Sequence, residues 1–545
     1  MQMRFFMSMV EKCCVNSRSF DRFLATAKLK ELAKHPCDLT DPHLLTPARL
    51  QQLSAEACGI KFLYGTEQVT EEVMQALVEL SREAGVLQEM KKMQAGEVVN
   101  KIEGFPSENR KVLHTAVRDF FEAPNQAKEA CEATKEAKKE IDKLQHFINK
   151  IDKDQRFTDL IMIGIGGSDL GPKAHYIALQ PLQKKGRKVH FISNVDPDDA
   201  AMVLKNVDLS TTLVVCVSKS GTTLETLTNE EIVRSHFQKA SLHPRNHFIA
   251  VTGRGSPMDN PHQYLESFYI WDWIGGRYST TSMVGGVMLS FAFGFEVFWE
   301  LLRGANAMDK VALNPSIKHN LPLLGALLGI WNRNFLGHPT VALIPYSQAL
   351  SRFPAHIQQL DMESNGKHTD RRGNQVSFQT GPIIWGEPGT NAQHSFFQLI
   401  HQGTAPIPVE FIGFKESQHK KDFLYKGTYS QEKLLANLFA QAIALAAGQK
   451  NPDNMNKSFF GNRPSHILLA RQLTPHILGS LLAYFEHKVA FEGFIWGINS
   501  FDQEGVQLGK ILANKIIDQF SFKRGIGEKS EFALGEAMIR HLETL

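Results

Sequence analysis

Short apolar segments, each followed by a polar or glycine-bearing loop and then a helical pattern, constrain the fold of this chain most. The first group is residues 160–165 (LIMIGI), 189–193, 212–217 and 248–252. Segments that are apolar throughout, rich in β-branched residues and alternating with helices indicate a parallel sheet covered on both faces. The same order returns at residues 341–345, 382–385 and 409–413. The sequence therefore predicts an α/β protein with two doubly wound parallel sheets.

Helical patterns surround these segments. Apolar side chains recur at helical spacing in residues 71–84, the first 150 residues are mainly helical in pattern, and residues 284–334 form a long helical stretch between the two groups of strands. A chain of 545 residues is too long for one hydrophobic core. We expect a helical N-terminal part at 1–125, a small domain at 126–305, a large domain at 306–515 and a C-terminal tail at 516–545.

The charge balance argues against a nucleic acid or an anionic membrane as partner. Lys and Arg number 60 and Asp and Glu number 57, so bulk electrostatic attraction is weak. No apolar run is long enough to span a bilayer. The six cysteines form no CxxC pair, which fits neither a disulfide framework nor a zinc site. We expect a protein of the reducing cytoplasm, with no metal and no membrane partner.

The loop at residues 164–171 (GIGGSDLG) follows the first predicted strand. In parallel sheets, ligands collect where loops leave the carboxyl ends of strands. The loop contains Gly167 and Ser168, but Asp169 stands where a dinucleotide fingerprint has its third glycine, so a nicotinamide site is rejected. The loop is either a tight turn alone or a turn whose backbone amides approach an anion.

The loop at residues 218–223 (SKSGTT) follows another predicted strand and precedes a helical pattern. It brings Ser218, Lys219, Ser220 and Thr223 to the amino end of a helix, where free amides and the helix dipole favour an anion. Capping of the helix would need one hydroxyl, whereas the loop has four. The Walker pattern is absent. We therefore expect a phosphate-binding loop without nucleoside triphosphate hydrolysis.

Two further segments carry a cation and a carboxylate. Residues 272–279 (DWIGGRYS) place Arg277 beside paired glycines. A guanidinium there forms either a structural salt bridge or a fixed cation that stabilises a developing oxyanion. Residues 359–367 (QLDMESNGK) contain Gln359 and Glu363 in a segment dense with polar groups. Local sequence leaves open whether Glu363 is structural or catalytic.

His394 and Lys510 stand on two other predicted helices. His401 follows His394 by two helical turns, about 10.5 Å at 1.5 Å per residue, which is too far for the pair to share a metal. A lone histidine is more often structural than functional. Gln503, Gln507 and Lys510 fall at i, i+4 and i+7 on one predicted helix face. That face suits either solvent or a hydroxylated or anionic ligand.

Taken together and in this order, the motifs resemble those of the phosphoglucose isomerase family, and its bacterial members most. The resemblance runs from about residue 109 to residue 510. The matching motifs are DWIGGRYSTTSMVG at 272–285, GINSFDQEGVQLGK at 497–510, GIGGSDLGP, SNVDP, SKSGTT, MESNGK, GPIIWGEPGTNAQHSFFQLIHQGT and GNRPS.

The resemblance implies two sugar-isomerase (SIS) domains with helical N-terminal and C-terminal extensions, in a homodimer whose active sites are built from both subunits. It implies reversible conversion of glucose 6-phosphate to fructose 6-phosphate through a cis-enediol, in glycolysis and gluconeogenesis, without a cofactor. Glu363 is implied as the base between C1 and C2, and Arg277 as stabilising the enediolate. His394, contributed across the dimer interface, is implied in ring opening with help from Lys510.

The implied substrate-binding residues fall into a phosphate group and a sugar group. Those implied at the phosphate end are Ser168, Ser218, Lys219, Ser220 and Thr223, and Gly167 is implied as a further substrate-binding residue. Those implied along the sugar are Gln359 and Gln503. The alternative is a sugar-phosphate-sensing regulatory protein built on the same fold. Such a protein would keep SKSGTT but would have no need of Glu363, His394 and Lys510, all of which are present.

Overall fold

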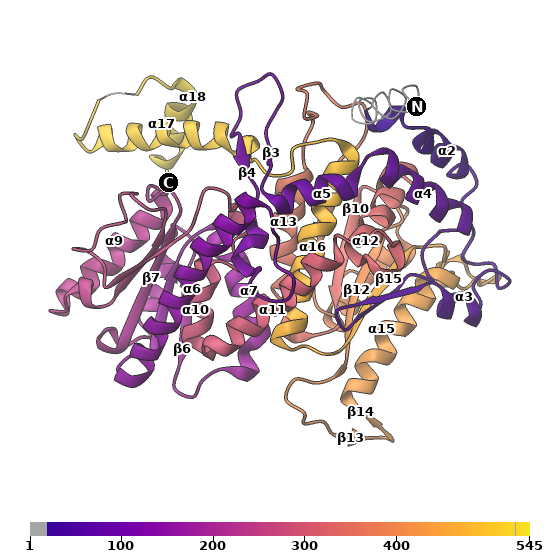
Figure 1. Cartoon of the computed structure of the whole chain (residues 1–545), viewed down its shortest axis with the longest axis horizontal. Coiled ribbons are helices and arrows are strands. Elements are labelled where there is room, and N and C mark those ends of the chain that lie inside the picture. Colours follow the sequence, from indigo (N-terminus) through magenta and orange to yellow (C-terminus); the bar gives the residue numbers. More distant parts are fainter. Residues whose placement is uncertain (1–18, 529) are drawn as a thin grey trace. The chain divides into compact units, whose positions relative to one another are not determined.

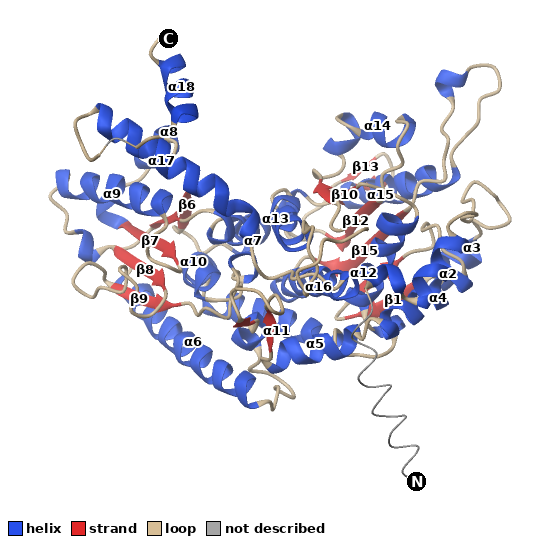
Figure 2. Ribbon diagram, turned by 90° about the horizontal axis from the view of Figure 1, so that it is seen from above, coloured by secondary structure: helices blue, strands red, loops and turns tan. Residues whose placement is uncertain are grey.

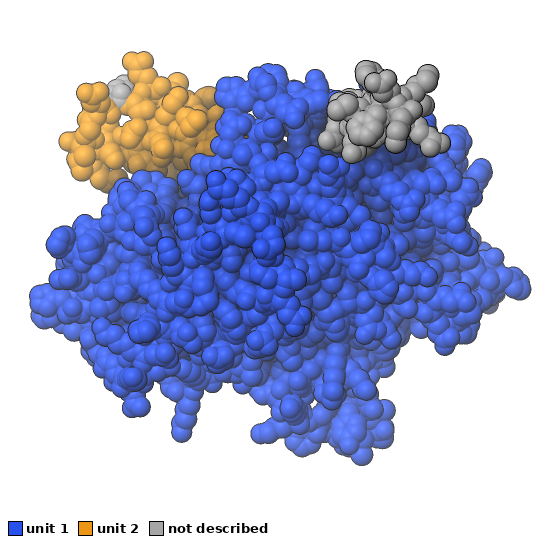
Figure 3. All heavy atoms as spheres, viewed as in Figure 1, with its two compact units in different colours: residues 1–500 blue, residues 501–545 orange. Residues whose placement is uncertain are grey.

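The computed structural model describes residues 19–528 and 530–545. Two compact units make up the chain, Met1–Ser500 and Phe501–Leu545, and Figure 3 colours them separately. The first unit contains both sheets that the sequence predicts. The second consists of η13 (Glu504–Val506), α17 (Gln507–Lys523) and α18 (Ala533–Leu542). The expected division of the chain into four segments stays a prediction.

The smaller parallel sheet has five strands in the order β6-β5-β7-β8-β9, and every neighbouring pair is parallel. Its strands are β5 (Asp159–Ile163), β6 (Lys188–Ile192), β7 (Thr212–Ser218), β8 (Phe248–Thr252) and β9 (Glu266–Tyr269). The chain runs from β5 to β6 on one side and then returns to β7 on the other. The strand order therefore reverses between β5 and β7, which is where such sheets bind ligands.

Helices cover both faces of this sheet, as Figure 2 shows. On one face α8 (Pro197–Leu204) and α9 (Leu224–Lys239) pack over Ile161, Val214 and Phe248. On the other lie α6 (Lys128–Asp154) and α10 (Met283–Phe293). All residues of the central strand β7 are consequently buried. The prediction of a doubly wound sheet is confirmed here.

The larger sheet has six strands in the order β1-β2-β15-β12-β10-β11. Four of them are parallel, and β2 and β1 extend the sheet in antiparallel fashion. Its strands are β1 (Ser54–Ala57), β2 (Ile60–Leu63), β10 (Thr340–Pro345), β11 (Ile383–Trp385), β12 (Val409–Glu416) and β15 (Ser465–Gln472). Neither β15 nor the pair β1–β2, which lies in the part expected to be mainly helical, is predicted from the sequence pattern. Both β1 and β2 are four residues long and only partly buried, so their apolar pattern is weak.

Three helices lie between the two sheets: α7 (Leu170–Leu179), α13 (Phe353–Asn365) and α16 (Pro475–Trp496). Figures 1 and 2 show them in the middle of the first unit, and they pack against one another. Because α16 is enclosed on all sides, nearly all of its residues are buried. The predicted helical stretch at 284–334 is divided into α10, α11 (Phe295–Val311) and α12 (Leu321–Ile330). Gly294, with φ 98°, separates the first two of these helices.

The remaining helices surround this central arrangement. They are α2 (Leu24–Leu32), α3 (Pro47–Gln52), α4 (Glu71–Glu83), α5 (Val86–Ala95), α14 (Phe397–Gln402) and α15 (Ser430–Ala447). Two short antiparallel pairs complete the fold: β3 (Val98–Asn100) with β4 (Arg110–Lys111), and β13 (Leu424–Tyr425) with β14 (Thr428–Tyr429). In the described ranges, no helix combines the length and the apolarity that crossing a membrane requires.

Candidate active site

The glycine loop after β5 packs directly against the segment that carries Arg277. Gly167 lies in η3 (Gly166–Ser168), and Arg277 lies in η7 (Gly276–Tyr278). A Cβ atom on Gly167 would stand 2.2 Å from the carbonyl carbon and oxygen of Gly276. Only glycine permits this approach. The hydroxyl of Ser279 donates to the carbonyl of Gly167 at 3.4 Å, which ties the two segments together.

Arg277 is held on three sides. Its side chain is 1% exposed, and its Nη1 atom lies 3.5 Å from Oε1 of Glu363. Its Nε donates to Ser364 Oγ at 2.6 Å, and its Nη2 donates to the carbonyl of Ser500 at 2.7 Å. Ser364 Oγ also lies 3.1 Å from the hydroxyl of Tyr278. Nothing in the local sequence shows that Ser364 and Ser500 hold Arg277 in place, because only the packing brings these segments together.

Glu363 and Gln359 are one turn apart on α13, and both lie near the loops of the smaller sheet. The Glu363 side chain is 25% exposed, so it can reach a ligand. Gln359 Nε2 lies 3.3 Å from the Cβ position built on Gly166. Gln359 Oε1 is buried and has no hydrogen-bond partner among the described residues. An unpartnered polar atom beside a glycine turn suits a hydroxylated ligand.

The hydroxyl loop after β7 has an internally ordered core. The hydroxyls of Ser218 and Thr223 lie 2.8 Å apart, and Ser218 Oγ accepts from the amide of Gly221 at 3.1 Å. Thr223 is the N-cap residue of α9, yet its side chain makes no capping hydrogen bond. Ser220 is exposed, and its Oγ accepts from the Thr222 hydroxyl at 2.8 Å. The loop therefore presents hydroxyls at a helix start without using the Thr223 hydroxyl as a cap.

Lys219 connects this loop to the segment of Arg277. Its Nζ donates to the carbonyl of Ile274 at 3.0 Å. Burial lowers the pKa of Lys219, with the nearby cation of Arg110 acting in the same direction. Gly253 N donates to the Lys219 carbonyl at 2.9 Å, which holds the loop against the end of β8. The structure thus links the hydroxyl loop, through one lysine, to the segment that presents Arg277.

His394 is not near this group within one chain. It ends η11 (Asn391–His394), and its side chain is exposed. The neighbouring Gln393 accepts from the hydroxyl of Tyr346, which directly follows β10, at 3.1 Å. His394 therefore lies by the carboxyl edge of the larger sheet. The helix α13 connects the parallel strands β10 and β11, so it runs from the carboxyl edge of the sheet back to the amino edge. Glu363 is near the end of this helix and therefore lies by the amino edge. The two residues consequently lie at opposite edges of the sheet.

Gln503 and Lys510 belong to the second unit. Lys510 is exposed on α17, which begins at Gln507, whereas Gln503 precedes η13. The expectation that both lie on one face of a single helix is wrong, because a 3-10 turn intervenes. Within residues 19–528 and 530–545, no three His, Cys, Asp or Glu side chains form a group suited to a metal ion.

Two helix-covered parallel sheets carry glycine- and hydroxyl-rich loops at the point of strand reversal, with a cation–carboxylate pair beside them. These features define a doubly wound α/β protein with a candidate site for a small ligand. Comparison with known proteins identifies the family within this class. The family model described as phosphoglucose isomerase matches residues 63–532. The chain therefore belongs to the phosphoglucose isomerase family.

Individual relatives and solved structures are similar to this chain over most of its length. A glucose-6-phosphate isomerase of Protochlamydia amoebophila (strain UWE25) is 62% identical over 525 residues, which cover 96% of this chain and 97% of the relative. The crystal structure of a glucose-6-phosphate isomerase from Chlamydia trachomatis D/UW-3/Cx superposes with a TM-score of 0.93 at 50% identity, covering 97% and 100% of the two chains. A hypothetical protein from Thermus thermophilus superposes with a TM-score of 0.63 at 26% identity, covering 80% and 96%.

Proposed function

We propose that this chain interconverts glucose 6-phosphate and fructose 6-phosphate through a cis-enediol, with Glu363 as the base that moves the proton between C1 and C2. The observation that carries the proposal is the 3.5 Å approach of the Arg277 Nη1 atom to Glu363 Oε1. Aldose–ketose interconversion needs a base for the proton and a cation for the enediolate charge. The buried guanidinium and the partly exposed carboxylate supply these two groups.

The phosphate of the substrate is proposed to bind between the two loops at the strand reversal. Ser218, Ser220 and Thr223 offer hydroxyls at the start of α9, and Ser168 lies at the end of the glycine turn. Helix starts favour anions because their amides are free. Lys219 supplies a positive charge. Gly167 and Gln359 are proposed as further substrate-binding residues, with Gln359 on the sugar side of the phosphate.

The remaining catalytic groups are proposed to come from two copies of the chain. Glu363 and His394 lie at opposite edges of the larger sheet, so one chain does not bring them to one substrate. A homodimer in which a second copy delivers His394 resolves this separation. His394 would then open the sugar ring, with Lys510 assisting and Gln503 contacting the sugar. Two-fold dimers are the commonest oligomers, and their contacts are reciprocal, so both sites would be completed together.

The cellular setting proposed is the cytoplasm, with a role in glycolysis and gluconeogenesis. The cysteines that the structure describes, Cys37, Cys58, Cys131 and Cys216, are free. Free thiols suit a reducing compartment.

A coupled assay tests the proposed function. Fructose 6-phosphate is supplied, the glucose 6-phosphate formed is oxidised by an added dehydrogenase, and a chelator is present throughout. We expect turnover that the chelator leaves unchanged. Binding of the sugar phosphate without any turnover would instead support the sensing protein.

A further inference from the structure

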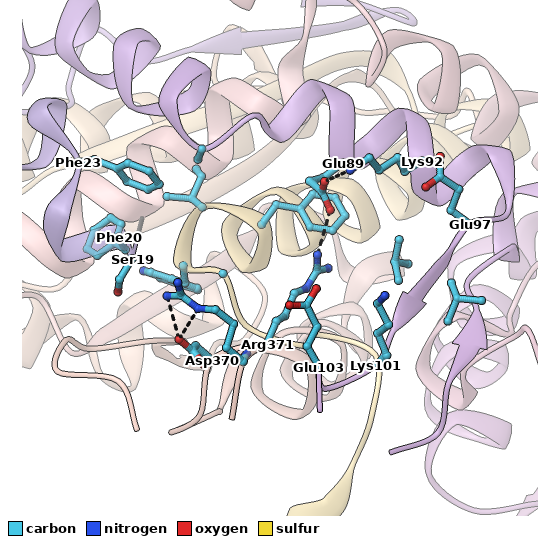
Figure 4. Close-up of a pocket in the computed structure, with 18 residues that line it drawn as sticks. Ser19, Phe20, Phe23, Glu89, Lys92, Glu97, Lys101, Glu103, Asp370 and Arg371 are labelled. Atoms are coloured by element: carbon cyan, nitrogen blue, oxygen red, sulfur yellow. Dashed lines mark hydrogen bonds and ion pairs between the residues drawn. The ribbon is translucent and has the colours of Figure 1, made fainter. Parts of the chain in front are cut away.

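A cavity of about 240 Å³ lies next to α5 and the β3 strand, and none of the proposed active-site residues lines it. Figure 4 shows its lining side chains. Charged groups form much of the wall: Glu89, Lys92, Glu97, Lys101, Glu103, Asp370, Arg371 and Arg372. Aromatic rings form another part of the wall: Phe20, Phe23, Phe494 and Trp496. At roughly 30 Å³ per molecule this space would hold about eight waters, so it suits a small metabolite.

Arg371 has one donor group left over in this cavity. Its Nη1 donates to Glu89 Oε2 at 3.0 Å, and its Nε donates to the carbonyl of Ile498 at 3.2 Å. Its Nη2 atom is buried and has no hydrogen-bond partner among the described residues. Burial lowers the pKa of Arg371 despite the neighbouring Glu89. Buried donors are almost always satisfied in folded proteins, so this one calls for an acceptor.

The other cations of the wall divide into paired and unpaired groups. Lys92 Nζ lies 2.8 Å from Glu89 Oε1, and Arg372 Nη2 lies 3.2 Å from Asp370 Oδ2. Lys101 is exposed and forms no ion pair with any described residue. Figure 4 shows Lys101 and the guanidinium of Arg371 along the same part of the cavity. Both residues line the cavity, and the carboxylate of Glu103 lies beside the Arg371 guanidinium in the same view and acts to raise its pKa.

We propose that this cavity is a second ligand site, which binds a small metabolite through a carboxylate or phosphate oxygen that accepts from Arg371 Nη2 and is balanced by Lys101. Oxyanions are the natural partners of a guanidinium donor. The aromatic side of the cavity accommodates the apolar part of the ligand. Glu97 and Glu103 are exposed and can turn to solvent when the anion enters.

A short path connects this site to the proposed active site. The amide of Arg371 donates to the carbonyl of Gly497 at 2.8 Å, and its Nε holds the carbonyl of Ile498. Two residues further on, the carbonyl of Ser500 accepts from Arg277 Nη2 at 2.7 Å. An anion that draws Arg371 into the cavity acts on the segment that holds Arg277. It should therefore change kcat, an effect that rests on the proposed function.

Isothermal titration calorimetry of the full chain tests the binding. The probes are succinate, which carries carboxylates, and inorganic phosphate, so that the two oxyanion sources are distinguished. We expect saturable binding of at least one probe to the wild type and to the Ser218→Ala/Thr223→Ala variant. Arg371→Gln and Lys101→Ala should each weaken it by about tenfold, since a hydrogen bond to a charged group is lost. No saturable binding, or binding lost only in the loop variant, would overturn the site.

Thermal midpoints and isomerase kinetics of the variants distinguish loss of the binding site from loss of folding. Arg371→Gln also breaks the contact with Glu89, so its thermal midpoint is recorded. Lys101 is exposed, and its replacement should leave that midpoint unchanged while still weakening binding. In the isomerase assay, a binding probe should change kcat in the wild type, and in Lys101→Ala the same change should need about tenfold more probe. Purely competitive inhibition would place the probe at the proposed active site and would overturn the proposed effect of the second site on kcat. The calorimetric test of binding does not depend on whether the protein turns over a substrate.

Discussion

The Nη1 atom of Arg277 lies 3.5 Å from Oε1 of Glu363, and the two side chains differ sharply in exposure, at 1% and 25%. The cation is fixed by Ser364 and by the carbonyl of Ser500. The carboxylate is the member of the pair that a ligand can reach. This arrangement suits a reaction in which Glu363 acts as the base and Arg277 stabilises the negative charge that develops on the substrate. Because Arg277 is already held in position, it need not reorient during the reaction.

Glu363→Gln should lower kcat by roughly 10²–10⁴-fold, the usual contribution of a positioned base, with KM little changed. The amide keeps the size of the side chain but cannot take up the proton. Steady-state kinetics with fructose 6-phosphate measure both constants, and the thermal midpoint shows that the variant is folded. A kcat near that of the wild type would exclude Glu363 as the base.

Ser218→Ala combined with Thr223→Ala should raise KM by about tenfold or more, because two hydrogen bonds to a charged phosphate are removed. The value of kcat should change less. Thr228→Ala is the matched control, since Thr228 lies further along α9 and its hydroxyl donates to the carbonyl of Leu224. An unchanged KM in the double variant would contradict a phosphate site at this loop.

Mixing two inactive variants tests whether active sites are shared between copies. Glu363→Gln and His394→Ala subunits, unfolded together and refolded, should recover roughly a quarter of the wild-type activity, because half of the dimers are mixed and each holds one complete site. Each variant refolded alone is the control. If the mixture stays as inactive as its components, Glu363 and His394 act in the same chain.

Gly167→Ala should destabilise the protein by roughly 1–3 kcal/mol, the range for an inserted methyl group in a packed region. The new Cβ would stand 2.2 Å from the Gly276 carbonyl. The displacement of η7 should also lower kcat through Arg277. Gly276→Ala is the control for stability, because its Cβ would meet no atom within 4 Å. Equal thermal midpoints for the two variants would argue against this close packing.

Acid should destabilise the packing of α7 on α13. His175 and His356 lie there with ring centroids 6.1 Å apart. Burial lowers the pKa of His175 to about 4 and that of His356 to about 3. An unfolded chain takes up these protons near pH 6.5, about its ordinary histidine pKa, so the unfolded state binds more protons below that pH. The free energy of unfolding should therefore fall as the pH drops from about 6.5 towards 4.

Thermal midpoints across this pH range measure the effect. His356→Gln removes one of the two groups and should make the decline shallower. His236→Gln, on the exposed face of α9, is the matched control and should keep the wild-type slope. The same slope in all three proteins would show that the buried pair does not govern the acid response.

Most of the smaller sheet was predictable, because its signals are local. Apolar segments of about five residues must be buried on both faces, and β8 (Phe248–Thr252) lies where its pattern predicts it. The pair β1–β2 was missed, since strands this short and half-buried carry little periodicity. The shared helix face for Gln503 and Lys510 was wrong because a 3-10 turn separates them.

The sequence alone determined the class of fold, the two loops at the strand reversal and the family. Each depends on residues close together in the chain, where burial and turn chemistry are encoded directly. Only the tertiary structure decided that Arg277 meets Glu363, that His394 lies at the opposite sheet edge, and that Arg371 faces a cavity with a donor to spare. These distances depend on how helices pack across the middle of the molecule, down to single contacts such as Gly167 on Gly276. Such complementarity between distant segments leaves no periodic trace in the sequence.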